Sequence, residues 1–183
     1  MAESLAATEG AILLVDATQG GQAQTIANYR IAEQRQLTLI PVLNKVDLPS
    51  ADIDAALAQL NDLDSAFTPE QVLQISAKTG QGVPAVLEAI KQRLPAPQGD
   101  LHQPLKALVF DSLYDPYQGV IAYVRLIDGQ RKSQQALCLM QGQQDFNGKA
   151  IGVFAPQMHP QESLSAGDVG YVVTGIKDPR KVR

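Results

Sequence analysis

The 183-residue chain contains no tryptophan and a single cysteine, Cys138. One cysteine excludes an internal disulfide, which suits a reducing compartment. No apolar run approaches the length of about 18 residues that a membrane-spanning helix needs. Residues 1–10 also lack the charged start and the apolar stretch of a signal peptide. The sequence therefore predicts a soluble, intracellular protein.

Basic residues are scarce in the first hundred residues, and the balance of charge changes beyond them. Residues 1–100 carry 6 Lys and Arg against 12 Asp and Glu, a net charge of −6, whereas residues 101–183 carry 9 against 7, a net charge of +2. Neither half is basic enough to indicate nucleic-acid binding from charge alone. The only histidines, His102 and His159, stand apart from any cysteine, so neither is expected to bind a metal.

Residues 37–43 are apolar apart from Thr38 and predict a buried strand. The run ends in Asn44-Lys45-Val46-Asp47, a cluster too polar to continue into a core. In open α/β sheets, ligands bind at the carboxyl ends of the strands, so Asn44, Lys45 and Asp47 are expected to face a ligand. The alternative is a solvated turn that Leu48-Pro49 closes.

The chemistry that suits this spacing is recognition of guanine. The carboxylate of Asp47 can accept hydrogen bonds from the ring N1–H and from the exocyclic amine, two donors that adenine does not offer there. A site with an unpaired buried carboxylate would reject adenine strongly. The amide of Asn44 can serve the base or tie neighbouring loops, and the stem of Lys45 can lie along a purine face.

A second polar loop follows the next predicted strand, residues 72–75. It reads Ser76-Ala77-Lys78-Thr79-Gly80 and precedes a helix. The backbone N–H of Ala77 could donate to the guanine O6, and Lys78 could cover the face opposite Lys45. An ordinary β–α turn with an exposed lysine is the other interpretation. We expect Asn44, Lys45, Asp47, Ser76, Ala77 and Lys78 to be nucleotide-binding residues.

The first hundred residues alternate between strand and helix patterns. Short apolar runs at residues 11–15, 37–43 and 72–75 predict strands, and amphipathic stripes follow each of them. Such units close as right-handed crossovers, which predicts an α/β three-layer fold with a parallel sheet. Ser50 is the expected N-cap of the second helix. Asp16, at the end of the first strand, has no evident partner in the sequence and is interpreted as a loop cap rather than a catalytic group.

Residues 94–100, Leu-Pro-Ala-Pro-Gln-Gly-Asp, form the best linker candidate. Beyond it come only short strand patterns, with turns at Asp128-Gly129, Gln141-Gly142, Asn147-Gly148 and Ala166-Gly167-Asp168. This pattern predicts a small all-β barrel, so we expect domains at 1–99 and 100–183. Tyr114, Tyr117 and Tyr123 are either half-buried barrel residues, the favoured interpretation, or a stacking surface for RNA.

Several stretches resemble one family. Gly10-Ala-Ile-Leu-Leu-Val-Asp-Ala-Thr-Gln-Gly20, Asn44-Lys-Val-Asp47 and Ser76-Ala-Lys78 are similar to the second half of the GTPase domain of translational GTPases. Phe110-Asp-Ser-Leu-Tyr-Asp-Pro-Tyr-Gln-Gly-Val120 and Ala166-Gly-Asp-Val-Gly-Tyr171 resemble the barrel of the LepA type, also called elongation factor 4 or the ribosomal back-translocating factor. The resemblance covers nearly the whole chain.

The resemblance implies a ribosome-dependent GTPase that acts in protein synthesis by back-translocation. It implies GTP or GDP as ligand, Mg²⁺ in the full-length parent only, and the ribosome, with its rRNA and proteins, and tRNA-bearing complexes as partners, with no DNA. Family members are cytoplasmic and are also described as peripheral on the cytoplasmic face of the bacterial inner membrane. By position, Asn44, Lys45 and Asp47 would read the base, with Ser76, Ala77 and Lys78 as the supporting loop.

The chain departs from the family in lacking Gly-x-x-x-x-Gly-Lys-Ser/Thr, the loop that holds the β and γ phosphates. Gly80-x-Gly82 is not a substitute, because no Gly-Lys-Ser/Thr follows it. We therefore expect no catalytic and no metal-binding residue in this fragment, and no GTP hydrolysis by it alone. Residues 130–137 also lack the Gly-Asp turn expected there. The alternatives are a non-hydrolysing guanine-nucleotide or partner-binding module, another translational GTPase subfamily, or a scaffold in which both loops are plain turns.

Overall fold

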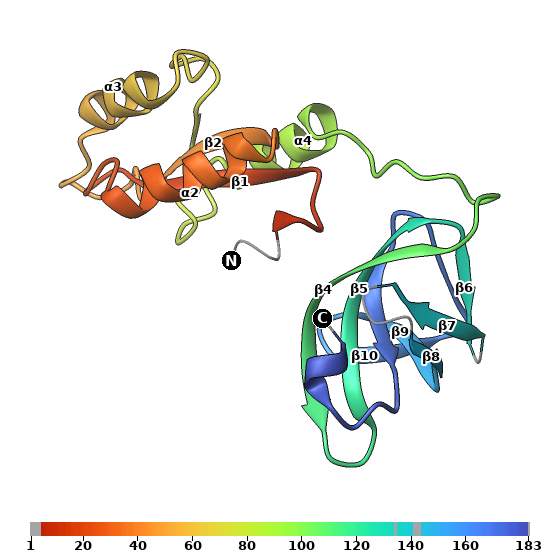
Figure 1. The fold of residues 1–183 in the computed structure, drawn as a ribbon. Helices are drawn as coiled ribbons and strands as arrows, with labels where there is room; N and C mark the ends of the chain where they lie inside the picture. The colour runs from red at the N-terminus through yellow and green to blue at the C-terminus, as the bar shows by residue number, and fades with distance from the viewer. Residues whose placement is uncertain (1–4, 134, 141–143, 183) are drawn as a thin grey trace. The chain divides into compact units, whose positions relative to one another are not determined.

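The computed structural model describes residues 5–133, 135–140 and 144–182. The chain divides into two compact units, one of residues 8–96 and one that joins residues 97–182 with residues 5–7. We call them the α/β unit and the β unit (Figure 1). Each is described by itself below.

The α/β unit alternates strands and helices, as the sequence predicts. Its three strands form a parallel sheet in the order β1-β2-β3, with each strand followed by a helix. The elements are β1 (Gly10–Asp16), α2 (Ala23–Gln34), β2 (Thr38–Asn44), α3 (Ile53–Leu63), β3 (Leu73–Gln74) and α4 (Val83–Arg93).

Helices cover both faces of this sheet, because alternate residues of each strand point to opposite sides. On one face, Leu13 and Val15 of β1 pack in one cluster with residues of α2 and α3, among them Tyr29 and Leu60. On the other face, Ile40 and Val42 of β2 pack against Val86 and Ala89 of α4. The predicted three-layer α/β architecture is therefore confirmed, and α2 can be followed across the sheet in Figure 1.

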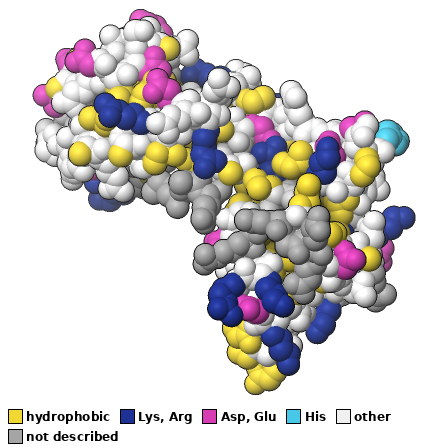
Figure 2. Space-filling model, viewed as in Figure 1, with side chains coloured by type: hydrophobic (Ala, Val, Ile, Leu, Met, Phe, Trp, Pro, Cys, Tyr) yellow, Lys and Arg dark blue, Asp and Glu magenta, His cyan; other side chains and the backbone are white. Residues whose placement is uncertain are grey.

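The N-cap of α3 is Asp52, not Ser50 as the sequence pattern predicted. The Asp52 carboxylate accepts the backbone N–H of Ala55 at 3.0 Å. Ser50 lies in a turn before the helix, where the Ala51 N–H donates to the Leu48 carbonyl. The prediction failed because Ser and Asp both favour this position, and only the turn decides between them. Acidic side chains gather over this end of the unit in Figure 2.

Strand β1 lies at the edge of the sheet and carries two exposed aliphatic side chains. Ile12 is 42% exposed and Leu14 is 55% exposed. Both alternate with the buried Leu13 and Val15, so they point to the face that α4 covers over β2 and β3. Large aliphatic side chains such as these are usually buried in a core, so their exposure indicates a surface on which another part of a protein could pack.

The β unit is built from short antiparallel strands. One sheet has the order β10-β9-β12-β5-β4, and the pairs β11-β6 and β7-β8 accompany it. The strands are β4 (Lys106–Asp115), β5 (Gly119–Asp128), β6 (Gln130–Lys132), β7 (Ala136–Leu139), β8 (Gln144–Asn147), β9 (Ala150–Phe154), β10 (Met158–Gln161), β11 (Ser163–Ser165) and β12 (Val169–Val173).

The β unit wraps a core of its own. Buried residues of β5, β9, β11 and β12 cluster together, and partly buried residues of β7 and β8 pack against them. The strand-only character predicted for this half is confirmed, apart from a short 3₁₀ helix at Pro179–Lys181. The predicted turn at Gln141-Gly142 lies outside the described residues.

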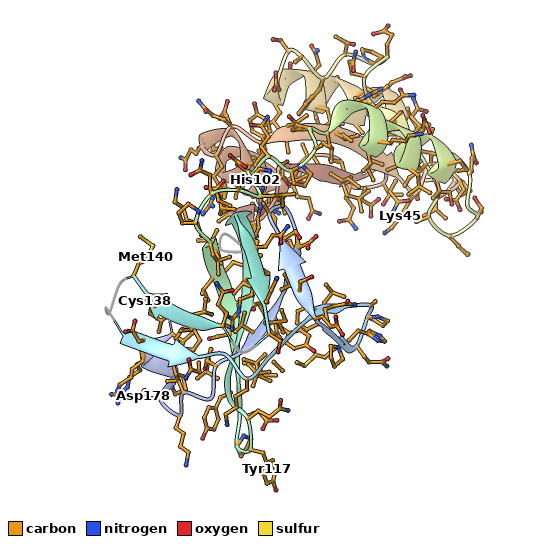
Figure 3. The ribbon with its side chains drawn as sticks, turned by 90° about the vertical axis from the view of Figure 1, so that its right-hand side faces the viewer. Lys45, His102, Tyr117, Cys138, Met140 and Asp178 are labelled. Atoms are coloured by element: carbon orange, nitrogen blue, oxygen red, sulfur yellow. The ribbon has the colours of Figure 1, made fainter. Side chains whose placement is uncertain are left out.

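The three tyrosines singled out from the sequence differ in environment. Tyr123 is partly buried and its ring meets that of Phe154 at 4.8 Å between centroids. Tyr114 is about half exposed, and Tyr117, in the turn between β4 and β5, is 94% exposed (Figure 3). The interpretation as half-buried barrel residues therefore holds for Tyr123 and is wrong for Tyr117.

Candidate functional site at the strand ends

The structure brings the two polar loops to the same edge of the parallel sheet. The Ile75 N–H donates to the Leu43 carbonyl at 2.8 Å, and the Val46 N–H donates to the Ile75 carbonyl at 3.2 Å. These bonds extend the β2–β3 pairing past the last strand residues. The side chains that follow each strand therefore meet at the carboxyl end of the sheet.

Asn44 ties the two loops together. Its side-chain Oδ1 accepts the backbone N–H of Ala77 at 3.0 Å. This is the loop-tying use of the amide that the sequence allowed for Asn44. A base carbonyl that takes the Ala77 N–H would have to replace Asn44 Oδ1, because the N–H can make one strong bond.

Lys45 has an unusual backbone conformation. Its φ is 65°, in the left-handed region that residues with a Cβ rarely adopt. The Lys45 carbonyl accepts the Leu48 N–H at 3.2 Å, so the chain turns sharply here. Figure 3 labels Lys45 at this end of the α/β unit. The turn leaves Asp47 exposed beside Lys45.

The ammonium of Lys45 pairs with Asp16. Its Nζ lies 2.6 Å from Asp16 Oδ2. Asp16 Oδ1 meanwhile accepts the backbone N–H of Thr18 at 2.9 Å and its hydroxyl at 2.7 Å. The bond from Lys45, with those from Thr18, lowers the pKa of the Asp16 carboxyl from 3.8 to about 2.

The loop-capping role expected of Asp16 is present, but its pairing with Lys45 was missed. A usable signal existed: in parallel strands predicted to be neighbours, the last residues of both strands lie side by side. In the β1–β2 register, Asp16 is opposite Asn44, the residue before Lys45. An acid and a base at such neighbouring strand ends are within reach of each other.

The second loop is a tight turn around Ser76. Ser76 is fully buried, its Oγ accepts the Thr79 N–H at 3.2 Å, and its carbonyl accepts the Gly80 N–H at 2.9 Å. Ala77 and Lys78 are exposed beside it. Ser76 therefore shapes the turn, and Ala77 and Lys78 are the members of the loop that a ligand could touch.

Two general features of the described residues bear on function. No three or more His, Cys, Asp or Glu side chains among them gather into a group that could hold a metal ion. None of the described helices combines the length and the apolar composition that crossing a bilayer requires.

Comparisons with known proteins agree on a translation factor. A family model described as the elongation factor Tu GTP binding domain matches residues 1–96. The chain is 97% identical over its whole length to "Elongation factor 4 2" of Lactiplantibacillus plantarum and 46% identical to "Elongation factor 4" of Aquifex aeolicus. It spans 31% and 30% of the length of these two relatives. The resemblance to elongation factor 4 is thus confirmed.

The fold agrees as well. The structure of translation elongation factor SelB from Methanococcus maripaludis, in its apo form, matches with a TM-score of 0.77 over 90% of this chain and 36% of that one, at 20% sequence identity. This likeness concerns the fold alone. Because the family model covers more than half of its residues, the chain belongs to the family of the elongation factor Tu GTP-binding domain.

Proposed function

We propose that the chain is part of a ribosome-dependent translational GTPase of the elongation factor 4 type. Residues 1–99 would be the C-terminal portion of its GTP-binding domain, and residues 100–183 its β-barrel domain. The support is the 97% identity over the whole chain together with the strand-end geometry. The chain spans about a third of such relatives, so the activity belongs to a longer protein.

The part of the activity assigned to this chain is recognition of the guanine base. Asp47 accepts the two donors of the base edge. The Ala77 N–H leaves Asn44 Oδ1 to donate to the base carbonyl, which frees the Asn44 amide for the remaining polar atoms of the base. Lys45 and Lys78 cover the two faces, and Ser76 holds the second loop in shape. The bond between Asn44 Oδ1 and the Ala77 N–H carries this proposal, because it places both loops at one position.

The phosphate and Mg²⁺ sites would lie in the rest of the parent, since no phosphate loop occurs in these residues. The exposed face of β1 supports this, because Ile12 and Leu14 offer apolar surface for a further part of the domain. The partners would be the ribosome and its tRNA-bearing complexes in the cytoplasm. The process that the parent carries out would be back-translocation of the ribosome. No observation supports the membrane association that the resemblance implies, and the proposal leaves it out.

The test uses ribosome-stimulated nucleotide hydrolysis by the full-length parent. Wild type should hydrolyse GTP and not ATP. In Asp47→Asn, one carboxylate oxygen becomes an NH₂ donor, which no longer accepts from the guanine amine but matches the C2 carbonyl of xanthine. We expect GTP turnover to fall at least tenfold and xanthosine triphosphate turnover to rise.

The matched control is Asp62→Asn, which makes the same chemical change at an exposed position on α3. It should leave both activities unchanged. Guanosine selectivity without ribosome-stimulated turnover would favour a non-hydrolysing binding module. Turnover of GTP that is indifferent to Asp47→Asn would contradict the proposed base site.

A further inference from the structure

The β unit contains a cavity of about 620 Å³ that the proposed function does not use. It lies between the edge strand β4 and the β7–β8 pair. Among the described residues, no strand pairing joins β4 to that pair. Small-molecule sites in proteins usually occupy about 300–1,000 Å³ and are mainly apolar. This cavity fits both descriptions, with aliphatic and aromatic walls that include Leu105, Val109, Leu137, Leu139 and Phe146.

One wall of the cavity is formed by a buried cation, Arg131. It sits on β6, opposite Leu164 of β11, and is 1% exposed. Its Nη1 donates to the Gln135 carbonyl, whereas Nε and Nη2 have no partner among the described residues. Burial lowers the pKa of the guanidinium, but an arginine stays protonated in proteins. The positive charge of Arg131 is therefore buried among mainly apolar side chains of the β unit.

The two unpartnered nitrogens are those that together form one edge of the guanidinium. Nε–H and Nη2–H point in parallel, which is the geometry that receives the two oxygens of a carboxylate. The described residues that line the cavity include a second cation, Lys106, and no Asp or Glu. The described part of the walls thus offers positive charge and apolar surface without a matching negative charge.

We propose that this cavity binds a small carboxylate with an apolar body, such as a medium-chain fatty acid. The carboxylate pairs with the Nε and Nη2 edge of Arg131, and the alkyl chain lies along Leu137, Leu139 and Phe146. This edge is buried in the structure, with Nη2 packed against Gly148, so the side chain turns it into the cavity when the carboxylate binds. Entry lies beside β7, where Cys138 and Met140 line the cavity and are exposed (Figure 3).

Calorimetric titration of the 183-residue chain with decanoate and with decanol tests this site. Decanoate should bind, and decanol, which lacks the charge, should bind at least tenfold more weakly. In Arg131→Leu, decanoate affinity should fall at least tenfold while decanol affinity stays the same or rises. Lys132→Leu is the matched control, because it removes the neighbouring cation, exposed on the same strand, and should change neither affinity.

A nuclear magnetic resonance measurement on wild type keeps the test independent of whether the variants fold. Decanoate should shift the Arg131 Nε–H signal, and decanol should leave it in place. Failure of decanoate to bind, equal decanoate affinity in wild type and Arg131→Leu, or an unmoved Nε–H signal would each overturn the proposal. The site makes no use of nucleotide, so none of these results bears on the guanine site.

Discussion

Asp16 Oδ2 and Lys45 Nζ lie 2.6 Å apart across the carboxyl ends of two neighbouring parallel strands. This ion pair fixes one side of the strand-end site while Asn44 and Ala77 tie the other. The lysine that would lie along a purine face is thus positioned by the residue that also caps the loop after β1. The site is a connected set of contacts rather than two independent turns.

We predict that Asp16→Asn destabilises the chain at neutral pH, by about 1 kcal/mol or less, because the partner ammonium is half exposed and screened. The folded carboxyl has its pKa lowered to about 2 from 3.8, so the unfolded chain takes up a proton first as the pH falls. The difference in free energy of unfolding between Asp16→Asn and wild type should be largest above pH 3.8 and should disappear as the pH falls toward 2. Urea unfolding at both ends of this range measures it.

The asparagine retains loop-capping ability, which isolates the charge. Lys45→Gln should give a similar loss, and the double variant should lose less than the sum of the two. A destabilisation that is independent of pH would count against an ionic contribution.

Asn44→Ala should free the Ala77 N–H and loosen the second loop. The expected loss in free energy of unfolding is about 0.5–1.5 kcal/mol, as for an ordinary hydrogen bond. Hydrogen exchange at the Ala77 amide should become faster. Asn61→Ala, which removes a side-chain amide with only a 3.5 Å contact, serves as the control and should leave that amide unchanged. Unaltered exchange in Asn44→Ala would show that the bond does not hold the loop.

Gly80 and Gly82 form a matched pair for the start of α4. Both have positive φ, 84° and 72°, so alanine at either should cost about 1–2 kcal/mol. A Cβ at Gly80 meets nothing within 4 Å, whereas a Cβ at Gly82 would lie 2.3 Å from the Gln74 carbonyl oxygen. We therefore expect Gly82→Ala to be clearly more destabilising than Gly80→Ala in urea unfolding. Equal losses would mean that β3 moves away without cost.

Arg131→Leu should stabilise the β unit, because it replaces an unpaired buried charge with an apolar side chain. The expected gain in free energy of unfolding is about 1–4 kcal/mol. Lys132→Leu, at an exposed position, should change stability by no more than about 0.5 kcal/mol. Thermal unfolding followed by circular dichroism measures both. A loss of stability in Arg131→Leu would indicate that the guanidinium contributes a favourable interaction in the folded state.

The periodic parts of the fold could be predicted from the sequence, and the short parts could not. The apolar runs that became β1 and β2, and the stripe that became α4, are long enough to show their period. Strand β6 has three residues, too few for any period, so the inward position of Arg131 had no signal. A charged residue is also a poor candidate for burial, so no pattern in the sequence predicted the cavity.

The positions of Asn44 and Ala77 at one sheet edge follow from a general property of parallel strands, and the sequence sufficed to predict it. The individual bonds did not follow. Whether the Ala77 N–H meets a ligand or Asn44, and whether Asp16 reaches Lys45, depends on side-chain directions that only the folded backbone sets. In the same way, whether Ser50 or Asp52 is the N-cap of α3 depends on the geometry of one turn.

The left-handed backbone of Lys45 has a consequence for engineering this protein. Glycine would adopt that φ of 65° without penalty, whereas a residue with a Cβ bears a cost of about 1–2 kcal/mol. Breaking the ion pair with Asp16 costs about 1 kcal/mol or less, which is the smaller of the two effects. A sequence optimised purely for thermal robustness would therefore replace Lys45 with glycine and would discard its ammonium. Selection of variants for heat resistance alone thus risks erasing the strand-end site while leaving a well-folded molecule behind.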